Sequence, residues 1–308
     1  MADREMIAAA FTDAGIGQIW FDEPMARHAS LKLGGPVDVL VAPENEEQLG
    51  RVVRILKEKG IAFMPAGNLT NILFTDAGYH GVVLWMKQMD KIQFLPGPDD
   101  EFVIEAQAGA SLGKAVTLAA QKGLTGLEFA CGIPGSVGGA IRMNAGAYGK
   151  EMKDVISVVM LIYGEGKRKT LRRDEIKFSY RSADLPTQAI VSGARFIVRK
   201  GNTEEIKRRM EEIQKQRREK HPLEYPSAGS VFKNPPGLSA GRLIEELGLK
   251  GRRLGDVQVS KKHANFIVNK GQGTASEMTA LIELIQDRAR AEKGVTLETE
   301  IVIVGDKR

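Results

Sequence analysis

The spacing of hydrophobic and polar residues alternates between two periods along the chain. Apolar residues three or four positions apart predict amphipathic helices, whereas shorter apolar runs bounded by Gly, Pro or Asn predict strands. One helix is expected to begin at Asn45 and to stop at Gly60, and the strands on either side of it close a small β-α-β unit. In the first part of the chain the predicted elements are a helix at 2–14, a strand at 37–43, a helix at 45–60, strands at 61–67, 81–86 and 102–109, and a helix at 111–123.

The second part of the chain continues this alternation after a glycine-rich stretch, residues 127–155, that has few helix signals. We expect strands at 155–163, 168–175 and 189–201 in one sheet, then a basic helix at 203–220, a helix at 239–248, a strand at 266–271, a helix at 274–294 and a final strand at 295–305. Mixed helices and strands of this kind predict an α+β or α/β protein. The natural domain boundary is near residue 201, with parts at about 20–85 and 86–201 before it and a domain at 202–308 after it.

The composition of the 308 residues, with 43% hydrophobic and 27% charged residues, is that of an ordinary globular protein. No apolar run approaches the ~18 residues that a membrane span needs, and the N-terminus lacks the basic start of a secretory signal. Cys131 is the one cysteine of the sequence, which excludes an internal disulfide and suits a reducing cytoplasm. With four scattered histidines, no metal site is expected.

The formal net charge of +5 is compatible with nucleic acid or with an anionic small substrate as the ligand. The most basic run, 204–221, interleaves acids with bases at helical spacing, which is typical of a solvated helix with ion pairs. Aromatic residues that could stack on bases do not accompany this run. A nucleic-acid-binding protein without cofactor is therefore an alternative that the sequence disfavours.

Two glycine-rich segments have the composition of phosphate-binding loops. They are "PAGNLTNIL" at 65–73, directly after a predicted strand, and "CGIPGSVGGAIRMNAGAYG" at 131–149. Glycine lets successive backbone N–H groups face an anion, because no Cβ blocks a close approach. Neither segment has the Walker A ending or the dinucleotide-binding pattern of a Rossmann fold. Two surface loops with many turns remain the alternative, less so for the second segment because of its length.

Two further segments carry candidate chemistry. Ser230, in "PSAGSVFKNPPG", has neither a neighbouring histidine base nor a nucleophile elbow, so that it is either a turn residue or a serine that works without a base. Arg181, in "FSYRSADLP", can grip a carboxylate through two parallel hydrogen bonds, although an isolated arginine is more often exposed and structural.

The segments "GIPGSVGGAIRMNAGAYG", "SYRS", "PSAGSVFKNP" and "VTLETEI" together strongly resemble the UDP-N-acetylenolpyruvoylglucosamine reductase family in its type II form. The resemblance extends from about Arg27 to Gly305. It implies an α+β fold, in which a two-subdomain FAD-binding module of the vanillyl-alcohol-oxidase type is followed by a smaller α+β substrate domain.

The resemblance also implies an activity. Members reduce the enolpyruvyl ether of UDP-N-acetylglucosamine-enolpyruvate to UDP-N-acetylmuramate for peptidoglycan synthesis, with FAD as cofactor and NADPH as co-substrate. It further implies a cytoplasmic enzyme that binds a UDP-sugar, and it gives no reason to expect nucleic acid, a membrane or an obligate protein partner. A sugar or alcohol oxidase on the same FAD fold is the alternative within this fold.

The resemblance assigns three catalytic residues. Negative charge that builds on the substrate carbon and its carboxylate needs fixed donors nearby, and Arg181 is similar to the arginine that supplies them. Glu300 is similar to a glutamate beside the developing charge, which has to be protonated and therefore needs a raised pKa. Ser230 is similar to the general acid, since a strongly basic intermediate requires a positioned hydroxyl more than a low pKa.

The same resemblance implies the ligand contacts. Leu69 departs from the family pattern, because the family has glycine at that position of the pyrophosphate loop. The implied cofactor-binding residues are Gly67, Asn68, Leu69, Thr70, Asn71, Gly132, Ile133, Pro134, Gly135, Ser136, Gly138, Gly139 and Asn144. The implied substrate-binding residues are Tyr180, Lys220, Lys233 and Asn234.

Overall fold

The computed structural model describes residues 4–13, 15–98 and 101–305. Its backbone packing divides the chain into two compact units, neither of which is a continuous segment. Unit 1 consists of Met1–Phe21, Val39–Asn68 and Gly81–Lys215, and unit 2 of Asp22–Asp38, Leu69–His80 and Gln216–Arg308. The domain boundary near residue 201 stays a prediction, and each unit is described by itself below.

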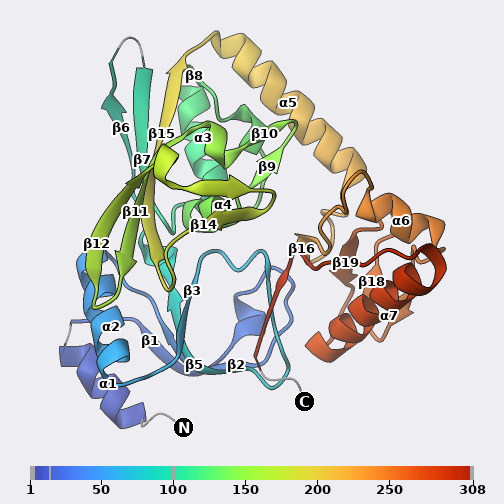
Figure 1. Ribbon diagram of the computed structural model, residues 1–308, viewed down its shortest axis with the longest axis horizontal. Coiled ribbons are helices and arrows are strands. Elements are labelled where there is room, and N and C mark those ends of the chain that lie inside the picture. Colours follow the sequence, from blue (N-terminus) through green and yellow to red (C-terminus); the bar gives the residue numbers. More distant parts are fainter. Residues whose placement is uncertain (1–3, 14, 99–100, 306–308) are drawn as a thin grey trace. The chain divides into compact units, whose positions relative to one another are not determined.

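The first sheet has the strand order β1-β2-β5-β3 and is followed through the blue and cyan part of Figure 1. The predicted helix caps are confirmed here, because the Asn45 side chain accepts a hydrogen bond from the Gln48 N–H and Gly60 has the positive φ that stops a helix. β3 pairs in parallel with β5, which lies between β2 and β3. The elements are α1 (Arg4–Asp13), β1 (Ile19–Pro24), β2 (Pro36–Val41), α2 (Glu46–Glu58), β3 (Phe63–Ala66) and β5 (Tyr79–Trp85).

The large sheet of unit 1 has the order β12-β11-β15-β7-β6, with neighbouring strands antiparallel. It unites the three strands that the sequence predicts to share a sheet, so that this prediction is confirmed. Its strands are β6 (Ile92–Pro96), β7 (Glu101–Gln107), β11 (Ile156–Tyr163), β12 (Lys167–Arg172) and β15 (Ile190–Lys200), and β8 (Leu124–Thr125) also pairs with β15.

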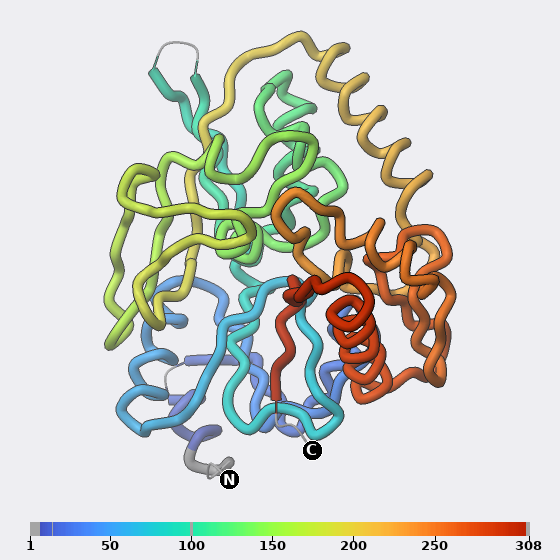
Figure 2. Tube along the Cα trace, turned by 45° about the vertical axis from the view of Figure 1, so that its right-hand side comes forward, coloured from blue at the N-terminus to red at the C-terminus, as the bar shows by residue number. Residues whose placement is uncertain are grey.

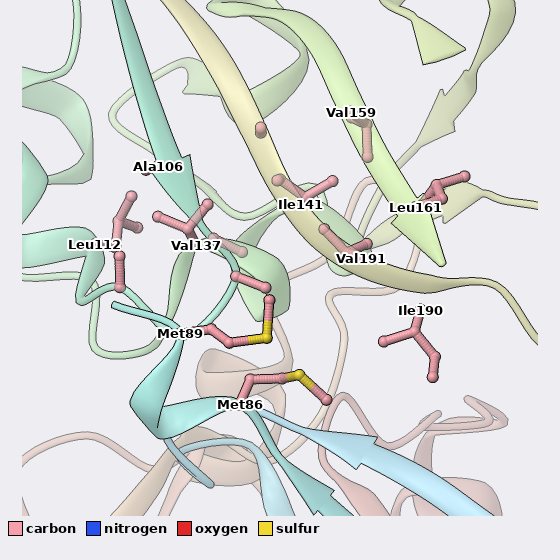
Figure 3. Close-up of a cluster of buried hydrophobic side chains, with 14 of the residues drawn as sticks. Met86, Met89, Ala106, Leu112, Val137, Ile141, Val159, Leu161, Ile190 and Val191 are labelled. Carbon is pink, nitrogen blue, oxygen red and sulfur yellow. The ribbon is translucent and has the colours of Figure 1, made fainter. Parts of the chain in front are cut away.

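The core of unit 1 lies where the large sheet meets the helices that pack on it (Figure 3). Val137 and Ile141 of α4 contribute to it, and α4 packs against β15 and β7. Full burial of each such side chain stabilises the fold by about 1.5–3 kcal/mol. α4 belongs to the stretch in which the sequence shows few helix signals, because glycines mask its apolar spacing. The remaining elements of unit 1 are α3 (Leu112–Gln121), α4 (Val137–Arg142), β9 (Gly146–Ala147), β10 (Lys150–Glu151), β13 (Lys177–Ser179) and β14 (Ser182–Asp184).

Unit 2 contains the sheet β16-β19-β18-β17 and a separate parallel pair, β4 with β20. Figure 2 shows the red C-terminal strand beside the cyan segment with which it pairs. α5 (Thr203–Lys220) leads into this unit. The other elements are β4 (Ile72–Phe74), β16 (Ser227–Ser230), α6 (Ala240–Glu246), β17 (Arg253–Leu254), β18 (Val257–Val259), β19 (Phe266–Asn269), α7 (Ala275–Lys293) and β20 (Val302–Val304). Short 3-10 helices of the chain are Met25–Arg27, Met86–Gln88, Glu128–Ala130, Met152–Asp154 and Arg173–Glu175.

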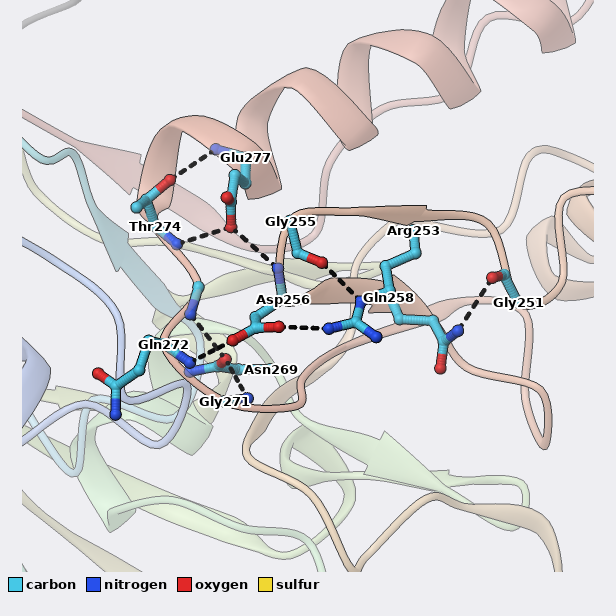
Figure 4. A network of polar contacts seen from close by, with 11 residues as sticks. Gly251, Arg253, Gly255, Asp256, Gln258, Asn269, Gly271, Gln272, Thr274 and Glu277 are labelled. Carbon is cyan, nitrogen blue, oxygen red and sulfur yellow. Dashed lines mark hydrogen bonds and ion pairs between the residues drawn. The ribbon is translucent and has the colours of Figure 1, made fainter.

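The start of α7 is fixed by a polar network (Figure 4). Thr274 and Glu277 form a reciprocal capping box, and the Glu277 carboxylate also accepts from the Asp256 N–H at 3.4 Å. Asp76, from the β4 side of unit 2, accepts hydrogen bonds from the Ala275 and Ser276 N–H groups at 2.9 and 2.8 Å. Two chain segments nearly 200 residues apart are therefore joined at one helix terminus.

The prediction of a continuous strand at 295–305 is wrong for its first part. Only Val302–Val304 form a strand, and residue 299 makes an isolated bridge to Phe232. The alternation of polar and apolar residues at 295–301 reflects an extended segment whose apolar side chains, Leu297 and Ile301, reach the core of unit 2. In the part of the chain that the structure describes, no helix combines the length and apolar character that crossing a membrane requires.

Candidate functional site

The two glycine-rich loops meet in unit 1 at Gly67 and Ser136. A Cβ on Gly67 would lie 2.0 Å from the Ser136 Oγ, which is possible for no other residue type without a rearrangement. The Gly67 carbonyl accepts a hydrogen bond from the Trp85 indole N–H at 3.1 Å, and this bond anchors the first loop to the end of β5. Within unit 1, the two predicted phosphate-binding segments therefore touch each other at Gly67 and Ser136.

The second loop exposes its glycines and buries its apolar residues. Gly132 and Gly139 are exposed, whereas Val137 and Ile141 are buried. Gly132 and Gly135 have φ values of 77° and 137°, which only glycine adopts without strain. Exposed glycine backbone, with no acidic side chain among these loop residues, has the chemistry that a dinucleotide pyrophosphate requires. The residues present thus fit FAD.

The backbone conformation at Leu69 is one that favours glycine. Its φ is +54°, in the left-handed region that costs a non-glycine residue about 1–2 kcal/mol. The side chain is 2% exposed, so that burial of the leucine offsets this strain. The Leu69 carbonyl accepts from the backbone N–H of Ser30 at 3.2 Å and from its hydroxyl at 3.4 Å. The same hydroxyl donates to the Ser227 carbonyl at 2.8 Å, and this links the cofactor loop to β16 within unit 2.

Asn71 extends this link to the last segment of unit 2. Its side-chain amide donates to the Glu300 carbonyl at 3.0 Å, and its own carbonyl accepts from the Val302 N–H at 3.0 Å. Thr70, between Leu69 and Asn71, is half-buried. The end of the first glycine-rich loop is therefore hydrogen-bonded to the backbone on which the predicted catalytic glutamate lies.

Ser230 is the last residue of β16 and is half-buried. It pairs with Phe266 of β19, after an irregularity in the register that follows Ser227. Gly229 has φ +76°, so that the strand bends directly before the serine. Beyond it, the Val231 N–H donates to the Asn265 carbonyl at 2.8 Å. Ser230 is thus a positioned strand residue, and the interpretation as a simple turn residue is not supported.

Glu300 is brought next to Ser230 by backbone hydrogen bonds. The Glu300 N–H donates to the carbonyl of Val231, the residue after Ser230, at 2.7 Å. Glu300 is half-buried and precedes β20 rather than lying on it, so that the expectation of a strand position was wrong. The structure therefore brings together two of the three predicted catalytic residues within unit 2.

Arg181 lies in unit 1, in the two-residue turn of the hairpin β13–β14. Ser179 pairs with Ser182, which leaves Tyr180 and Arg181 as the turn. Arg181 has φ +56°, and its guanidinium donates to the Gly146 carbonyl at 3.3 Å and lies 5.1 Å from the Tyr180 ring centre. Backbone strain at a charged residue is a common property of functional sites.

Asn144 differs from the other predicted cofactor residues because it is 0% exposed. Its amide donates to the Glu151 carboxylate at 2.9 Å and to the Ser179 carbonyl at 3.1 Å, and its oxygen accepts from the Lys153 N–H at 3.0 Å. Both amide hydrogens and the oxygen of the side chain are thus engaged inside unit 1. Any contact of this residue with a cofactor would come from its backbone.

The predicted substrate-binding residues of unit 2 lie on the loop after β16 and at the end of α5. Lys233 pairs with Glu298 at 3.2 Å, and the Asn234 side-chain oxygen accepts from the Ala240 N–H at the start of α6 at 3.0 Å. Lys220 is exposed at the last position of α5.

His221 and His263 pack together near Lys220, with Phe266 against both rings. Burial, followed by the positive charge of Arg217, lowers the pKa of His221 to about 4. Burial also lowers the pKa of His263, as does the charge of Lys250. Both rings are therefore neutral at pH 7, and they do not add to the positive charge of the lysines.

Comparisons with known proteins agree with this geometry. A model of FAD binding domains matches residues 37–172, and a model of the C-terminal domain of UDP-N-acetylenolpyruvoylglucosamine reductase matches residues 221–304. A protein of Syntrophus aciditrophicus named UDP-N-acetylenolpyruvoylglucosamine reductase is 44% identical over 290 residues, which are 94% of this chain and 93% of that protein. Its namesake from Caldanaerobacter subterraneus is 46% identical over 292 residues, with 94% and 95% of the two chains covered.

This chain belongs to the UDP-N-acetylenolpyruvoylglucosamine reductase family. The crystal structure of UDP-N-acetylenolpyruvylglucosamine reductase from Thermus caldophilus also matches with a TM-score of 0.80 and 35% identity, over 94% of this chain and 98% of that one. The predicted fold class, an FAD-binding module followed by the reductase C-terminal domain, is thereby confirmed.

The FAD-binding model and the reductase C-terminal model cover most of the candidate site but leave a gap between them. Gly67 to Asn71 and Gly132 to Asn144 fall in the FAD-binding match, and Ser230 and Glu300 fall in the C-terminal match. Tyr180, Arg181 and Lys220 lie in the interval between the matches.

Sequence reasoning missed Ser30 and Asn265 as residues that support the site. Ser30 contacts the cofactor loop and β16. Asn265 accepts from the Phe232 N–H at 3.0 Å and donates to the Phe232 carbonyl at 2.8 Å. Of these two residues, only Asn265 could have been found from the sequence. It is a polar residue directly before the apolar run 266–268, and a buried polar side chain needs hydrogen-bond partners.

Proposed function

We propose that this protein reduces the enolpyruvyl ether of UDP-N-acetylglucosamine-enolpyruvate to UDP-N-acetylmuramate, a step in peptidoglycan synthesis. When bound, FAD supplies the hydride for this reduction and is itself reduced by NADPH. The family membership supports the substrate and the chemistry. The observation that supports the assignment in this chain is the backbone bond from Glu300 to Val231, because it brings the main chain at a carboxyl residue next to the residue that follows Ser230.

Arg181 binds and stabilises the substrate carboxylate in this proposal. Hydride addition to the terminal carbon leaves an electron pair on the adjacent carbon, and that charge spreads into the carboxylate. A guanidinium provides two parallel donors in a fixed plane, which a lysine cannot provide. The left-handed turn and the contact with the Gly146 carbonyl restrict where this guanidinium can point. The arginine is therefore oriented before the charge appears.

Ser230 then donates its hydroxyl proton to the carbon that carries the electron pair, and solvent restores the serine. The strand pairing with Phe266 and the bend at Gly229 fix the hydroxyl position. Glu300, in its protonated form, donates a hydrogen bond to the developing negative charge. Lys220, Lys233 and Asn234 bind the diphosphate of the substrate, and Tyr180 contacts the substrate next to Arg181.

An anaerobic two-step experiment with the purified holoenzyme tests this function. The visible flavin band should disappear on addition of NADPH and return when UDP-N-acetylglucosamine-enolpyruvate is added. Mass spectrometry should show a product heavier than the substrate by two hydrogen atoms. A flavin band that returns only with oxygen, together with peroxide formed from sugars or alcohols, would instead identify an oxidase. A colourless protein that binds DNA or RNA at physiological salt would contradict the proposal altogether.

A further inference from the structure

Asn144 and the Arg181 hairpin are joined by a contact that the catalytic proposal does not use. The Asn144 amide donates to the carbonyl of Ser179, the last residue of β13 before the Tyr180–Arg181 turn. Two residues after Asn144, the Gly146 carbonyl accepts from the Arg181 guanidinium. One short segment, 144–146, thus holds the hairpin both at its strand and at its arginine.

Asn144 is buried, and its hydrogen bonds hold its side chain in one orientation. The side chain is 0% exposed, and its partners fix the orientation of the amide, since two of them are acceptors and the third is a backbone N–H. Its φ of +40° belongs to the left-handed region, which asparagine tolerates better than most residues. The three partners, Ser179, Glu151 and Lys153, come from two different segments of the chain.

We propose that Asn144 is a positioning residue for Arg181, rather than a side-chain ligand of the cofactor. The hairpin β13–β14 pairs only with itself among the sheets that the structure describes, so that the large sheet does not fix its register. A two-stranded hairpin is marginally stable by itself. The hydrogen bond from Asn144 to Ser179, together with the packing of Ala183 in the core of unit 1, therefore fixes where the turn lies and where the guanidinium points.

The inference rests on the proposed function only for the role of Arg181. Its kinetic consequence is specific, because a misplaced guanidinium weakens the step that creates charge on the substrate. A displacement of about 1 Å at a catalytic group can cost about 100-fold in rate. Reduction of FAD by NADPH does not create that charge. The rate of this reduction should therefore stay the same when the contact that positions Arg181 is lost.

The double variant Asn144→Asp/Glu151→Gln removes the Ser179 contact and also the ion pair between Lys153 and Glu151, which the control below removes as well. The introduced aspartate still accepts from the Lys153 N–H, and the introduced glutamine donates to this aspartate, so that the bond between the two positions is kept with reversed polarity. The total charge of the pair is unchanged. Only the Ser179 carbonyl loses its donor. The matched control is Glu151→Gln alone, in which Asn144 can still donate to Ser179.

Hydrogen–deuterium exchange provides the readout that is independent of activity. In the double variant, we expect peptides over 177–184 to exchange faster than in the wild type, whereas peptides over 156–163 in β11 should be unchanged. Glu151→Gln should exchange like the wild type at both places. Slow, wild-type exchange at 177–184 in the double variant would overturn the proposal.

Single-turnover kinetics of the holoenzyme provide the second readout. In the double variant, reoxidation of the flavin by the enolpyruvyl substrate should slow by about 10- to 100-fold, with FAD content and the rate of reduction by NADPH within about twofold of the wild type. An equal loss in both half-reactions, or loss of FAD, would mean that Asn144 serves the cofactor and would overturn the proposal. A wild-type enzyme that does not react with the enolpyruvyl substrate would refute the proposed function instead. The exchange experiment would still test whether Asn144 holds the hairpin in place.

Discussion

The hairpin that carries Arg181 in unit 1 and the strand that carries Ser230 in unit 2 are each anchored by a buried asparagine. Asn144, 0% exposed, bonds to Ser179, which lies 35 positions further along the chain, and the hairpin of Ser179 has no other sheet partner among the described strands. Asn265, 4% exposed, bonds both backbone groups of Phe232, next to a strand that β19 already pairs. Side-chain contacts thus position the arginine, whereas main-chain pairing positions the serine.

This difference has a consequence for tolerance to mutation. A main-chain ladder survives the loss of a side chain, because its hydrogen bonds belong to the backbone. If the side-chain amide of Asn144 is removed, in contrast, no neighbouring backbone bond takes over its contact with the hairpin. We therefore expect the serine's position to be robust and the arginine's position to be sensitive, and the following experiments test this comparison from the largest effect to the smallest.

Replacement of Ser230, the proposed general acid, should have the largest effect. Ser230→Ala should lower the rate of flavin reoxidation by the enolpyruvyl substrate by about 10²- to 10⁴-fold, which is the usual contribution of a positioned general acid. Because backbone pairing fixes β16, the variant should fold normally and should be reduced by NADPH at the wild-type rate. Stopped-flow absorbance of the flavin measures both steps. Unchanged reoxidation would show that another group donates the proton.

Replacement of the arginine should have the next largest effect. Arg181→Lys keeps the charge but loses the two parallel donors, so that we expect turnover to fall by about 100-fold. Steady-state rates with saturating substrates measure it, and near-normal turnover would contradict the role of the guanidinium.

A second substitution at the same position separates stability from activity. Arg181→Gly removes the left-handed strain of about 1 kcal/mol, so that it should be at least as resistant to urea as Arg181→Lys while it has less activity. If the glycine variant were clearly less stable, the guanidinium contacts would outweigh the strain.

Removal of the unit 2 asparagine should affect stability more than chemistry. Asn265→Ala leaves the buried N–H and carbonyl of Phe232 without their side-chain partner, at a cost of about 2–4 kcal/mol in the free energy of unfolding. Urea titration measures this loss. Asn45→Ala, which removes the cap of α2, provides a graded control with an expected loss of about 1 kcal/mol. Equal losses in the two variants would mean that the Phe232 groups find water.

The smallest effect concerns the neutral histidine pair. The pKa of His221 is lowered to about 4, so that between pH 6.5 and pH 4 the unfolded chain binds protons that the folded chain does not. Stability therefore falls as the pH drops through this window, by about 1 kcal/mol once solvent screening of the half-buried ring is considered. Urea titrations at pH 7 and pH 5 should show a smaller difference for His221→Gln than for the wild type. An identical difference would assign the pH effect to other groups, such as His263, whose pKa is also lowered.

The sequence predicts the elements of both units well where a cap accompanies the periodicity. α7 occupies the predicted range 274–294, with Thr274 and Gly294 as its caps, and the three strands of the large sheet are found together. It fails for α4, where glycine replaces the apolar signal, and at 295–301, where an extended segment packs its apolar residues without forming a ladder. Local spacing does not report whether an extended segment has a partner strand.

The candidate site was recognisable from its motifs, but its organisation was not. Glycine density identified the loops at Gly67 and Ser136, yet their contact depends on chain segments that lie 69 positions apart. Asn144 looked like a ligand because of its place in a cofactor motif, whereas its three buried bonds are visible only in three dimensions. Ser30 belongs to no motif that the sequence analysis used, and only the fold connects it to Leu69 and Ser227.

The hydrogen bond from the Asn71 amide to the Glu300 carbonyl joins residues 229 positions apart, and the parallel pairing of β4 with β20 adjoins it. A ribosome therefore releases the first glycine-rich loop long before it makes the segment with which the end of that loop is hydrogen-bonded. Contacts of such sequence separation form late, because the intervening chain must first be closed into a loop. The pairing of β4 with β20 thus has to wait until residue 304 has been synthesised.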